Sequence, residues 1–168
     1  MNARILIGLI LLSFSFIDLN GQISSKTGAI VGTWRLVKSR QTMSDDTVRP
    51  ESGIGPNAVG YIIYTDAGVM CAFLSDPDRP KWQVQNAPSD PELRSAFDGM
   101  VSYCGTYDVN ERGGYVTHHV QMDKVPNIVG TDRKRYFTIA GNRLVLKPAI
   151  LPDGMKDWTI EWERVKQK

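Results

Sequence analysis

Short runs in which apolar and polar residues alternate recur along the chain, and most of them are joined by tight turns. Alternation with period two indicates β-strands, because successive side chains of a strand point to opposite faces. About eight such runs follow one another, at residues 30–39, 59–65, 69–74, 106–109, 115–122, 133–139, 143–148 and 157–165. Such a meander usually closes into a barrel, because closure removes exposed strand edges. The sequence therefore predicts an all-β fold, a closed antiparallel up-and-down barrel of about eight strands with one inserted helix.

The connections between these runs are of two kinds. Residues 66–68, 140–142 and 110–114 are short glycine-bearing segments, which are typical of β-hairpins. Residues 41–57 are polar and contain two prolines and two glycines, so they are expected to form a long loop. Residues 59–65 are apolar on both faces, which predicts a hairpin that is covered on both sides.

The inserted helix is expected at residues 91–103. Ser89 or Asp90 can cap its start, Pro91 suits the first turn, and apolar residues recur at helical spacing from Leu93 to Val101. We expect this helix to lie across one opening of the barrel or against its wall.

The first residues have the layout of a secretory signal peptide, because an apolar run at 5–17 follows a basic residue and precedes small and polar residues. The run is too short for a comfortable membrane span. We expect residues 1–21 to be a signal peptide, residues 22–29 a linker and residues 30–168 the barrel domain. An uncleaved anchor is the alternative. The mature protein is then expected to be exported, periplasmic or secreted, and to have no membrane span.

The overall charge and the absence of known motifs give no support to nucleic-acid binding or to several common classes of enzyme. A net charge of +2 over 168 residues gives no support to a nucleic-acid partner, because such partners require a clustered basic stripe. The sequence has no Gly-rich phosphate loop, no Gly-x-Ser-x-Gly and no His-Glu-x-x-His. These absences reduce the support for an enzyme. Neither a cofactor nor a metal is expected, and a haem bound through His118 alone is the alternative.

Cys71 and Cys104 are the only cysteines of the chain. Their spacing fits neither a metal site nor a Cys-x-x-Cys redox pair. An oxidising compartment would permit a disulfide between them. Two separate buried thiols are the alternative.

The only two histidines are adjacent, in the run at residues 115–122. Val116, His118 and Val120 share the apolar face, so His118 is predicted to lie inside the barrel and His119 to point toward solvent or a loop. The two side chains point apart and cannot bind one metal ion. Inside the barrel, His118 has three possible roles, which are a hydrogen bond in the core, contact with a ligand, and acid–base catalysis.

Arg135 is in phase with Phe137 and Ile139, so its guanidinium is predicted to face the interior. A buried charge is costly unless it is paired, and its partner would be a carboxylate, backbone carbonyls or an anionic ligand. An internal ion pair that braces the barrel is the alternative to a ligand site.

Three aromatic residues complete the candidate binding residues. Tyr64, Tyr103 and Trp158 can supply the aromatic walls of a mostly apolar pocket, and each also fits an ordinary core position.

Six blocks of the chain, spanning most of residues 30–165, resemble the lipocalin-like domain found in many small bacterial and fungal proteins. These blocks are GTWRLV at 32–37, VGYIIYT at 59–65, AFDGMVSYCGTYDV at 96–109, VTHHV at 116–120, PNIVGTDRKRYF at 126–137 and EWERV at 161–165. The resemblance implies a lipocalin-type barrel with an internal cavity. It implies no catalytic residues, because the family has no shared catalytic set to carry over. The signal-peptide layout departs from the usual pattern of the family.

Three functions are consistent with the sequence. The first is an exported protein that binds a small, largely apolar or amphipathic molecule with a polar or acidic head in the barrel lumen. The second is an isomerase or cyclase that acts on such a molecule with His118 as proton shuttle. The third is a filled barrel that acts as an interaction surface.

Overall fold

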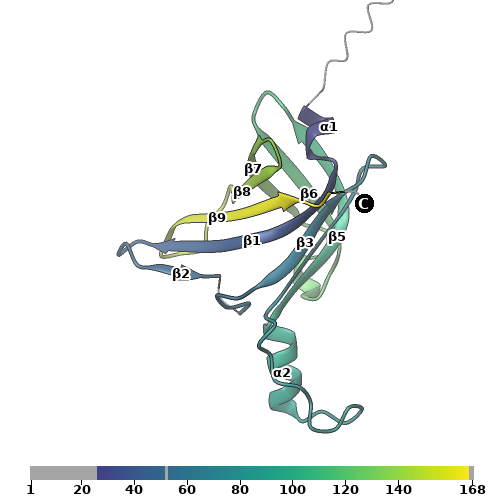
Figure 1. The fold of residues 1–168 in the computed structure, drawn as a ribbon, viewed down its shortest axis with the longest axis vertical. Helices are drawn as coiled ribbons and strands as arrows, with labels where there is room; N and C mark the ends of the chain where they lie inside the picture. Colours follow the sequence, from purple (N-terminus) through teal and green to yellow (C-terminus); the bar gives the residue numbers. More distant parts are fainter. Residues whose placement is uncertain (1–25, 52, 167–168) are drawn as a thin grey trace, which may run out of the picture.

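The computed structural model describes residues 26–51 and 53–166 (Figure 1). The predicted signal peptide lies outside these residues, and residues 26–29 of the predicted linker belong to a short helix. The helices are α1 (Lys26–Ile30), α2 (Asp90–Asp98) and the 3-10 turn η1 (Pro126–Ile128). The strands are β1 (Gly32–Met43), β2 (Val48–Pro50), β3 (Val59–Tyr64), β4 (Val69–Ser75), β5 (Met100–Asn110), β6 (Tyr115–Asp123), β7 (Asp132–Ala140), β8 (Arg143–Pro148) and β9 (Met155–Arg164).

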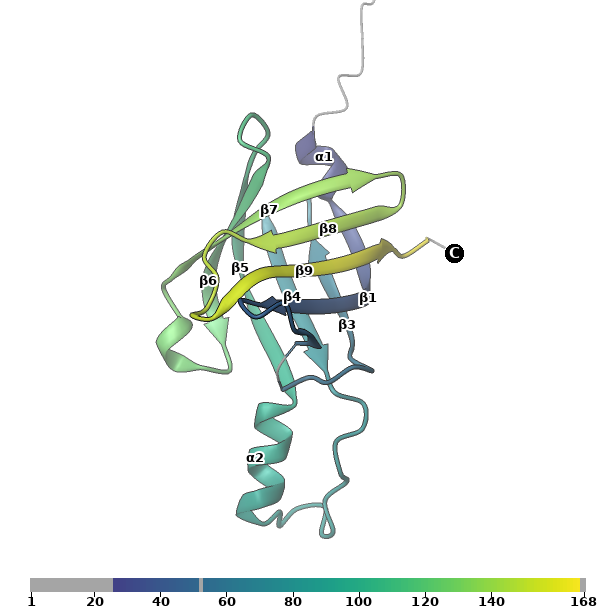
Figure 2. The same ribbon diagram turned by 90° about the vertical axis from the view of Figure 1, so that its left-hand side faces the viewer.

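The strands form one closed antiparallel sheet. Apart from β2, they follow the order β1-β3-β4-β5-β6-β7-β8-β9, and β1 pairs with β9 to complete an eight-stranded ring. Figures 1 and 2 show β1 and β9 side by side in both views. The predicted up-and-down barrel is confirmed.

The segment after the first strand is more regular than the predicted loop at residues 41–57. β1 continues to Met43, and β2 folds back on it through pairs such as Gln41 with Arg49. Beyond β2, Glu51 and Ile54 are buried. The prolines and glycines end regular structure here, but they do not prevent a short hairpin from forming first.

The predicted helix is shorter than expected, because α2 ends at Asp98 and β5 begins at Met100. The apolar residues Met100 and Val101 fit helical spacing, but they also fit the alternation of a strand, and pairing with β4 fixes them as strand. α2 has no buried residue, and Leu93 and Phe97 are nearly half exposed. In Figures 1 and 2 the helix projects from the end of the barrel opposite α1. It does not cover the wall.

Trp34, near the start of β1, is buried beside the end of α1. Its indole is fully buried and donates a hydrogen bond to the carbonyl of Ile30 at 2.8 Å. The guanidinium of Arg164 lies 4.0 Å from the ring centroid and donates to the carbonyl of Val31 at 2.7 Å. Gly32 has φ +135°, and a Cβ there would lie 2.5 Å from the Arg164 guanidinium. The positive φ is the stronger reason for glycine here, because other residues rarely adopt it.

The β3–β4 hairpin is covered on one face only, contrary to the prediction of cover on both sides. Ile62 and Tyr64 point into the core, whereas Val59, Tyr61 and Phe73 are exposed on the outer wall. An apolar strand does not by itself require burial on both faces.

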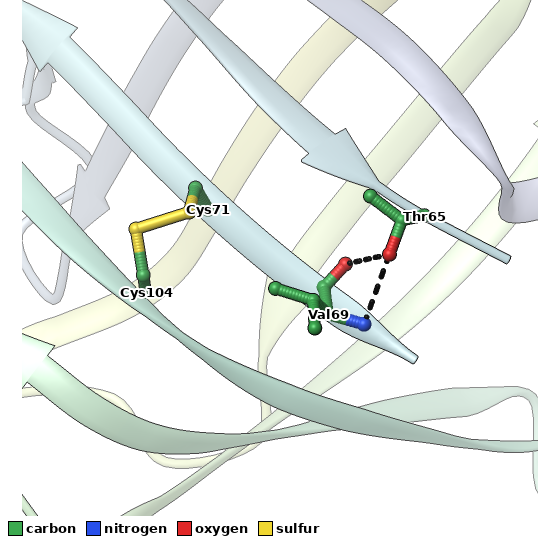
Figure 3. Close-up of a disulfide and its surroundings, with 4 residues drawn as sticks. All are labelled: Thr65, Val69, Cys71 and Cys104. Atoms are coloured by element: carbon green, nitrogen blue, oxygen red, sulfur yellow. Dashed lines mark hydrogen bonds between the residues drawn. A yellow bond between two sulfur atoms is a disulfide. The ribbon is translucent and has the colours of Figure 1, made fainter. Parts of the chain in front are cut away.

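Cys71 and Cys104 form a disulfide between β4 and β5 (Figure 3). The two residues are direct cross-strand partners, so the bond joins strands that are already hydrogen-bonded. Figure 3 also shows the Thr65 hydroxyl, which accepts a hydrogen bond from the backbone N–H of Val69 and donates to its carbonyl across the β3–β4 turn.

Candidate functional site

His118 lies at the centre of a fully buried polar group. Its Nε2 is 2.8 Å from the hydroxyl oxygen of Tyr64 on β3, and its Nδ1 is 3.0 Å from that of Tyr103 on β5. Val116 and Val120, which flank it on the same face of β6, are also buried. Three candidate residues from distant parts of the sequence therefore meet in one hydrogen-bonded cluster.

The barrel interior keeps this cluster neutral. Burial lowers the pKa of His118 well below its ordinary 6.5, and the positive charges of Arg135 and Arg133 lower it further. Burial also raises the pKa of both Tyr64 and Tyr103 above the ordinary 10.0. At neutral pH the cluster is thus an uncharged imidazole held between two protonated phenols.

The lumen is largely filled by side chains and retains a cavity of about 40 Å³. Tyr103, Arg135 and Trp158 line this cavity, whereas His118 and Tyr64 do not reach it. The other lining residues are Glu51, Ile62, Ala72, Leu74, Val101, Arg133, Leu146, Ile160 and Trp162. A space of this size holds a few water molecules or a small head group, not a whole apolar molecule.

A second hollow of about 420 Å³ lies on the outside of the barrel, between β7 and the loop that joins β8 to β9. The apolar part of its lining comes from Pro148 at the end of β8, residues 149–152 of this loop and Trp158 on β9. Arg133, Arg135 and Trp158 line both the outer pocket and the inner cavity. The pocket and the inner cavity therefore adjoin at these three residues.

Of the cavity residues that were not predicted as site residues, three have polar groups in their side chains, namely Glu51, Arg133 and Trp162. Glu51 lies in the segment that was predicted to be a loop, so its sequence context gave no reason to expect its side chain to be buried. Its carboxylate accepts a hydrogen bond from the Ser39 hydroxyl at 2.5 Å. Arg133 precedes Arg135 by two residues and therefore lies on the same face of the strand. The alternation of the strand could have predicted this position from the sequence. Trp162 lies four residues after Trp158 on β9, so alternation places the two side chains on the same face of the strand.

Arg135 has a carbonyl partner and no carboxylate partner. Its guanidinium donates to the carbonyl of Lys134 at 3.1 Å. Within residues 26–51 and 53–166, no carboxylate oxygen lies within 4.0 Å of it, whereas Arg133 has Asp123 at 3.9 Å. Arg135 therefore does not form, with any described residue, the internal ion pair that the sequence left as an alternative. Burial raises the pKa of Glu51, and the charge of Arg135 partly offsets this rise.

The model of one protein family, described as the lipocalin-like domain, matches residues 31–165. The chain belongs to the lipocalin-like domain family. The match covers every strand of the barrel, including β1 and β9, which close it.

Several solved structures of other proteins have a chain trace similar to that of this lipocalin-like domain. One is described as the REP1-NXSQ fatty acid transporter, with a TM-score of 0.40, 10% identity, and coverage of 84% of this chain and 99% of that chain. Another is the wild-type fluorescent protein UnaG, with a TM-score of 0.39, 15% identity, and coverage of 83% and 99%. Both similarities are too low to assign a ligand. The search of curated proteins found no match.

His119 lies on the outer face of the lipocalin-like domain, as alternation predicts. Its Nδ1 is 2.7 Å from Asp132 and its Nε2 is 3.0 Å from Asp108. Hydrogen bonds to the two carboxylates raise the pKa of His119, Asp132 contributing most. The two neighbouring histidines therefore have opposite pKa shifts.

The part of the lipocalin-like domain that the structure describes contains no cluster of three or more potential metal ligands. No helix among these residues is long and apolar enough to cross a membrane.

Proposed function

We propose that the protein binds a small, largely apolar molecule with a polar or acidic head. The body of the molecule would occupy the outer pocket, whose 420 Å³ is within the usual range for small-molecule sites. Its head would pass between Arg135 and Trp158 into the inner cavity. This arrangement fits a lumen that has room for a head group only.

The observation that carries this proposal is that the two hollows share Arg133, Arg135 and Trp158. An apolar pocket that ends at two guanidinium groups offers burial to one part of a molecule and charge complementarity to the other. Neither hollow alone provides both.

The isomerase or cyclase alternative receives less support from the geometry. His118 does not line the cavity, and both of its ring nitrogens are already engaged by tyrosines. A proton shuttle must reach the reacting atom directly or through one water molecule. In this arrangement His118 would act on a ligand only through Tyr103.

We test binding with Arg135→Ala. Native mass spectrometry of the purified protein would first identify a co-purifying molecule, and calorimetry would measure its affinity for each variant. Loss of a charged hydrogen bond predicts roughly 10- to 150-fold weaker binding. Arg143→Ala, which removes an exposed arginine from β8, is the matched control and should bind as wild type does. Equal affinity of all three proteins would reject the proposed site.

We further propose that the protein is exported after cleavage near Gly21. The amino-terminal layout and the Cys71–Cys104 disulfide support this, because oxidising compartments permit such bonds. Mass spectrometry of the exported fraction should find a chain that begins near Gln22. An intact amino terminus there would argue against cleavage.

A further inference from the structure

The neutral His118 imidazole can donate only one hydrogen bond and must accept the other. Two proton arrangements are therefore available. In the first, Nε2–H donates to Tyr64 and the Tyr103 hydroxyl donates to Nδ1. In the second, the Tyr64 hydroxyl donates to Nε2 and Nδ1–H donates to the Tyr103 oxygen. Each arrangement leaves one phenolic proton that needs a further acceptor.

The surroundings of the two tyrosines favour the second arrangement. Tyr64 is 1% exposed, does not line the cavity, and has no hydrogen-bond partner other than His118 among the described residues. Its proton would have no acceptor in the first arrangement, and a buried unsatisfied donor costs about 1–3 kcal/mol. Tyr103 lines the cavity, so its proton can be accepted by a group placed there. The Tyr103 O–H is thus a donor available to the lumen.

Arg135 offers further donors, because it uses one of its five N–H groups on the Lys134 carbonyl. Trp162 also lines the cavity, but its buried indole Nε1–H, which has no partner among the described residues, has no surface accessible to a water molecule and so does not open into the cavity. Among the described residues, Glu51 is the one carboxylate on the cavity wall, and it already accepts from Ser39. The cavity therefore has unused donors from Tyr103 and Arg135.

We infer that the cavity is a receptor for a carboxylate head group, whose oxygens accept hydrogen bonds from Tyr103 and Arg135. This inference rests on the proposed function and names the chemistry of the head. A carboxylate accepts hydrogen bonds and donates none, so it matches a wall of donors. The guanidinium of Arg135, which has no carboxylate within 4.0 Å among the described residues, also favours an anion over a neutral alcohol and disfavours an amine. The size of the cavity, about 40 Å³, suits such a head, with the tail left in the outer pocket.

The proton arrangement can be tested without any ligand. Long-range ¹H–¹⁵N correlation spectra at pH 7 should show that His118 is protonated at Nδ1 and not at Nε2. His119→Gln would assign the two imidazoles, because it removes the outer histidine and leaves His118 in place. An Nε2–H tautomer of His118 would direct the Tyr103 proton away from the cavity and would overturn the inference.

Binding can be tested with octanoate, 1-octanol and octylamine, which share a tail and differ in the head. Calorimetry at pH 7 should show octanoate binding at least about 10-fold more tightly than 1-octanol, and octylamine more weakly than either. Tyr103→Phe should weaken octanoate binding by roughly 10-fold or more. Tyr107→Phe is the matched control, because its hydroxyl donates to the Thr65 carbonyl and does not line the cavity.

Equal binding of the three probes, unaffected by Tyr103→Phe but weakened by Arg135→Ala, would overturn the carboxylate receptor and leave the proposed binding function intact. Binding of none of the three would overturn both.

Discussion

Two adjacent residues of one type experience opposite environments on the two faces of β6. Burial holds His118 neutral, whereas two carboxylates favour the charged form of His119. A lowered histidine pKa means that the unfolded state binds more protons, so the contribution of His118 to stability is present above pH 6.5 and is lost as the pH falls. For His119 the contribution is present below pH 6.5 and is lost as the pH rises through its raised pKa.

Replacing each histidine by alanine should separate the two environments. His118→Ala leaves the buried hydroxyls of Tyr64 and Tyr103 without their shared partner and opens a cavity, so it should lower the free energy of unfolding by roughly 2–5 kcal/mol. His119→Ala removes exposed hydrogen bonds and should cost under about 1 kcal/mol. Urea unfolding at pH 7 measures both. Similar losses for the two variants would contradict the burial of His118.

Glu51 should make stability fall with rising pH. Burial raises the pKa of Glu51 above its ordinary 4.5, so the folded state holds the proton more tightly than the unfolded state. The resulting stability is fully present below pH 4.5 and is lost as the pH rises through the raised pKa. Glu51→Gln cannot titrate, so its free energy of unfolding relative to wild type should increase between pH 4 and pH 7. Urea midpoints across this range test the prediction, and parallel curves for the two proteins would refute it.

For single helices and strands, the sequence predicted the structure best where the pattern of apolar residues was compatible with only one type of element. The run at residues 115–122 could only place His118 inward, and the structure does so. The spacing of Met100 and Val101 fitted both a helix and a strand. Their pairing with β4 makes them part of a strand, and β4 is separated from them in the sequence by α2 and the segment before it. The burial of Glu51 likewise depends on the hairpin in which β2 folds back on β1, and the polar segment that forms this hairpin has no periodicity that would predict it.

The disulfide should stabilise the β4–β5 pair without shaping it. Cys71 and Cys104 are already cross-strand partners and close a loop with a sequence separation of 33 that contains α2. In the chain-entropy model such a loop contributes roughly 3–4 kcal/mol, mainly by restricting the unfolded chain. Replacing both cysteines by alanine should therefore lower the free energy of unfolding by up to this amount and leave the near-ultraviolet circular dichroism of the folded protein similar. Reduced wild type is the control and should match the variant.

At the scale of the whole molecule, closure depends on the last strand. β9 supplies partners to both β1 and β8. Deleting residues 155–168 should therefore expose two strand edges, abolish the near-ultraviolet circular dichroism and cause aggregation, as size-exclusion chromatography would show. Deletion of residues 166–168, beyond the end of β9, should leave the barrel folded. A monomeric, folded product of the longer deletion would refute the dependence.

Because β1 pairs with β9, the barrel cannot close during synthesis until the last strand has been made. About 110 residues separate the end of β1 from the start of β9. At roughly 5–20 residues per second, about 5–20 seconds pass before the ribosome supplies the partner that β1 needs. Throughout this interval the chain can form hairpins but cannot form the finished barrel, and one edge of β1 is open to any other strand it meets. The nascent chain is therefore most vulnerable to mispairing, and most accessible to chaperones, until its final residues are made.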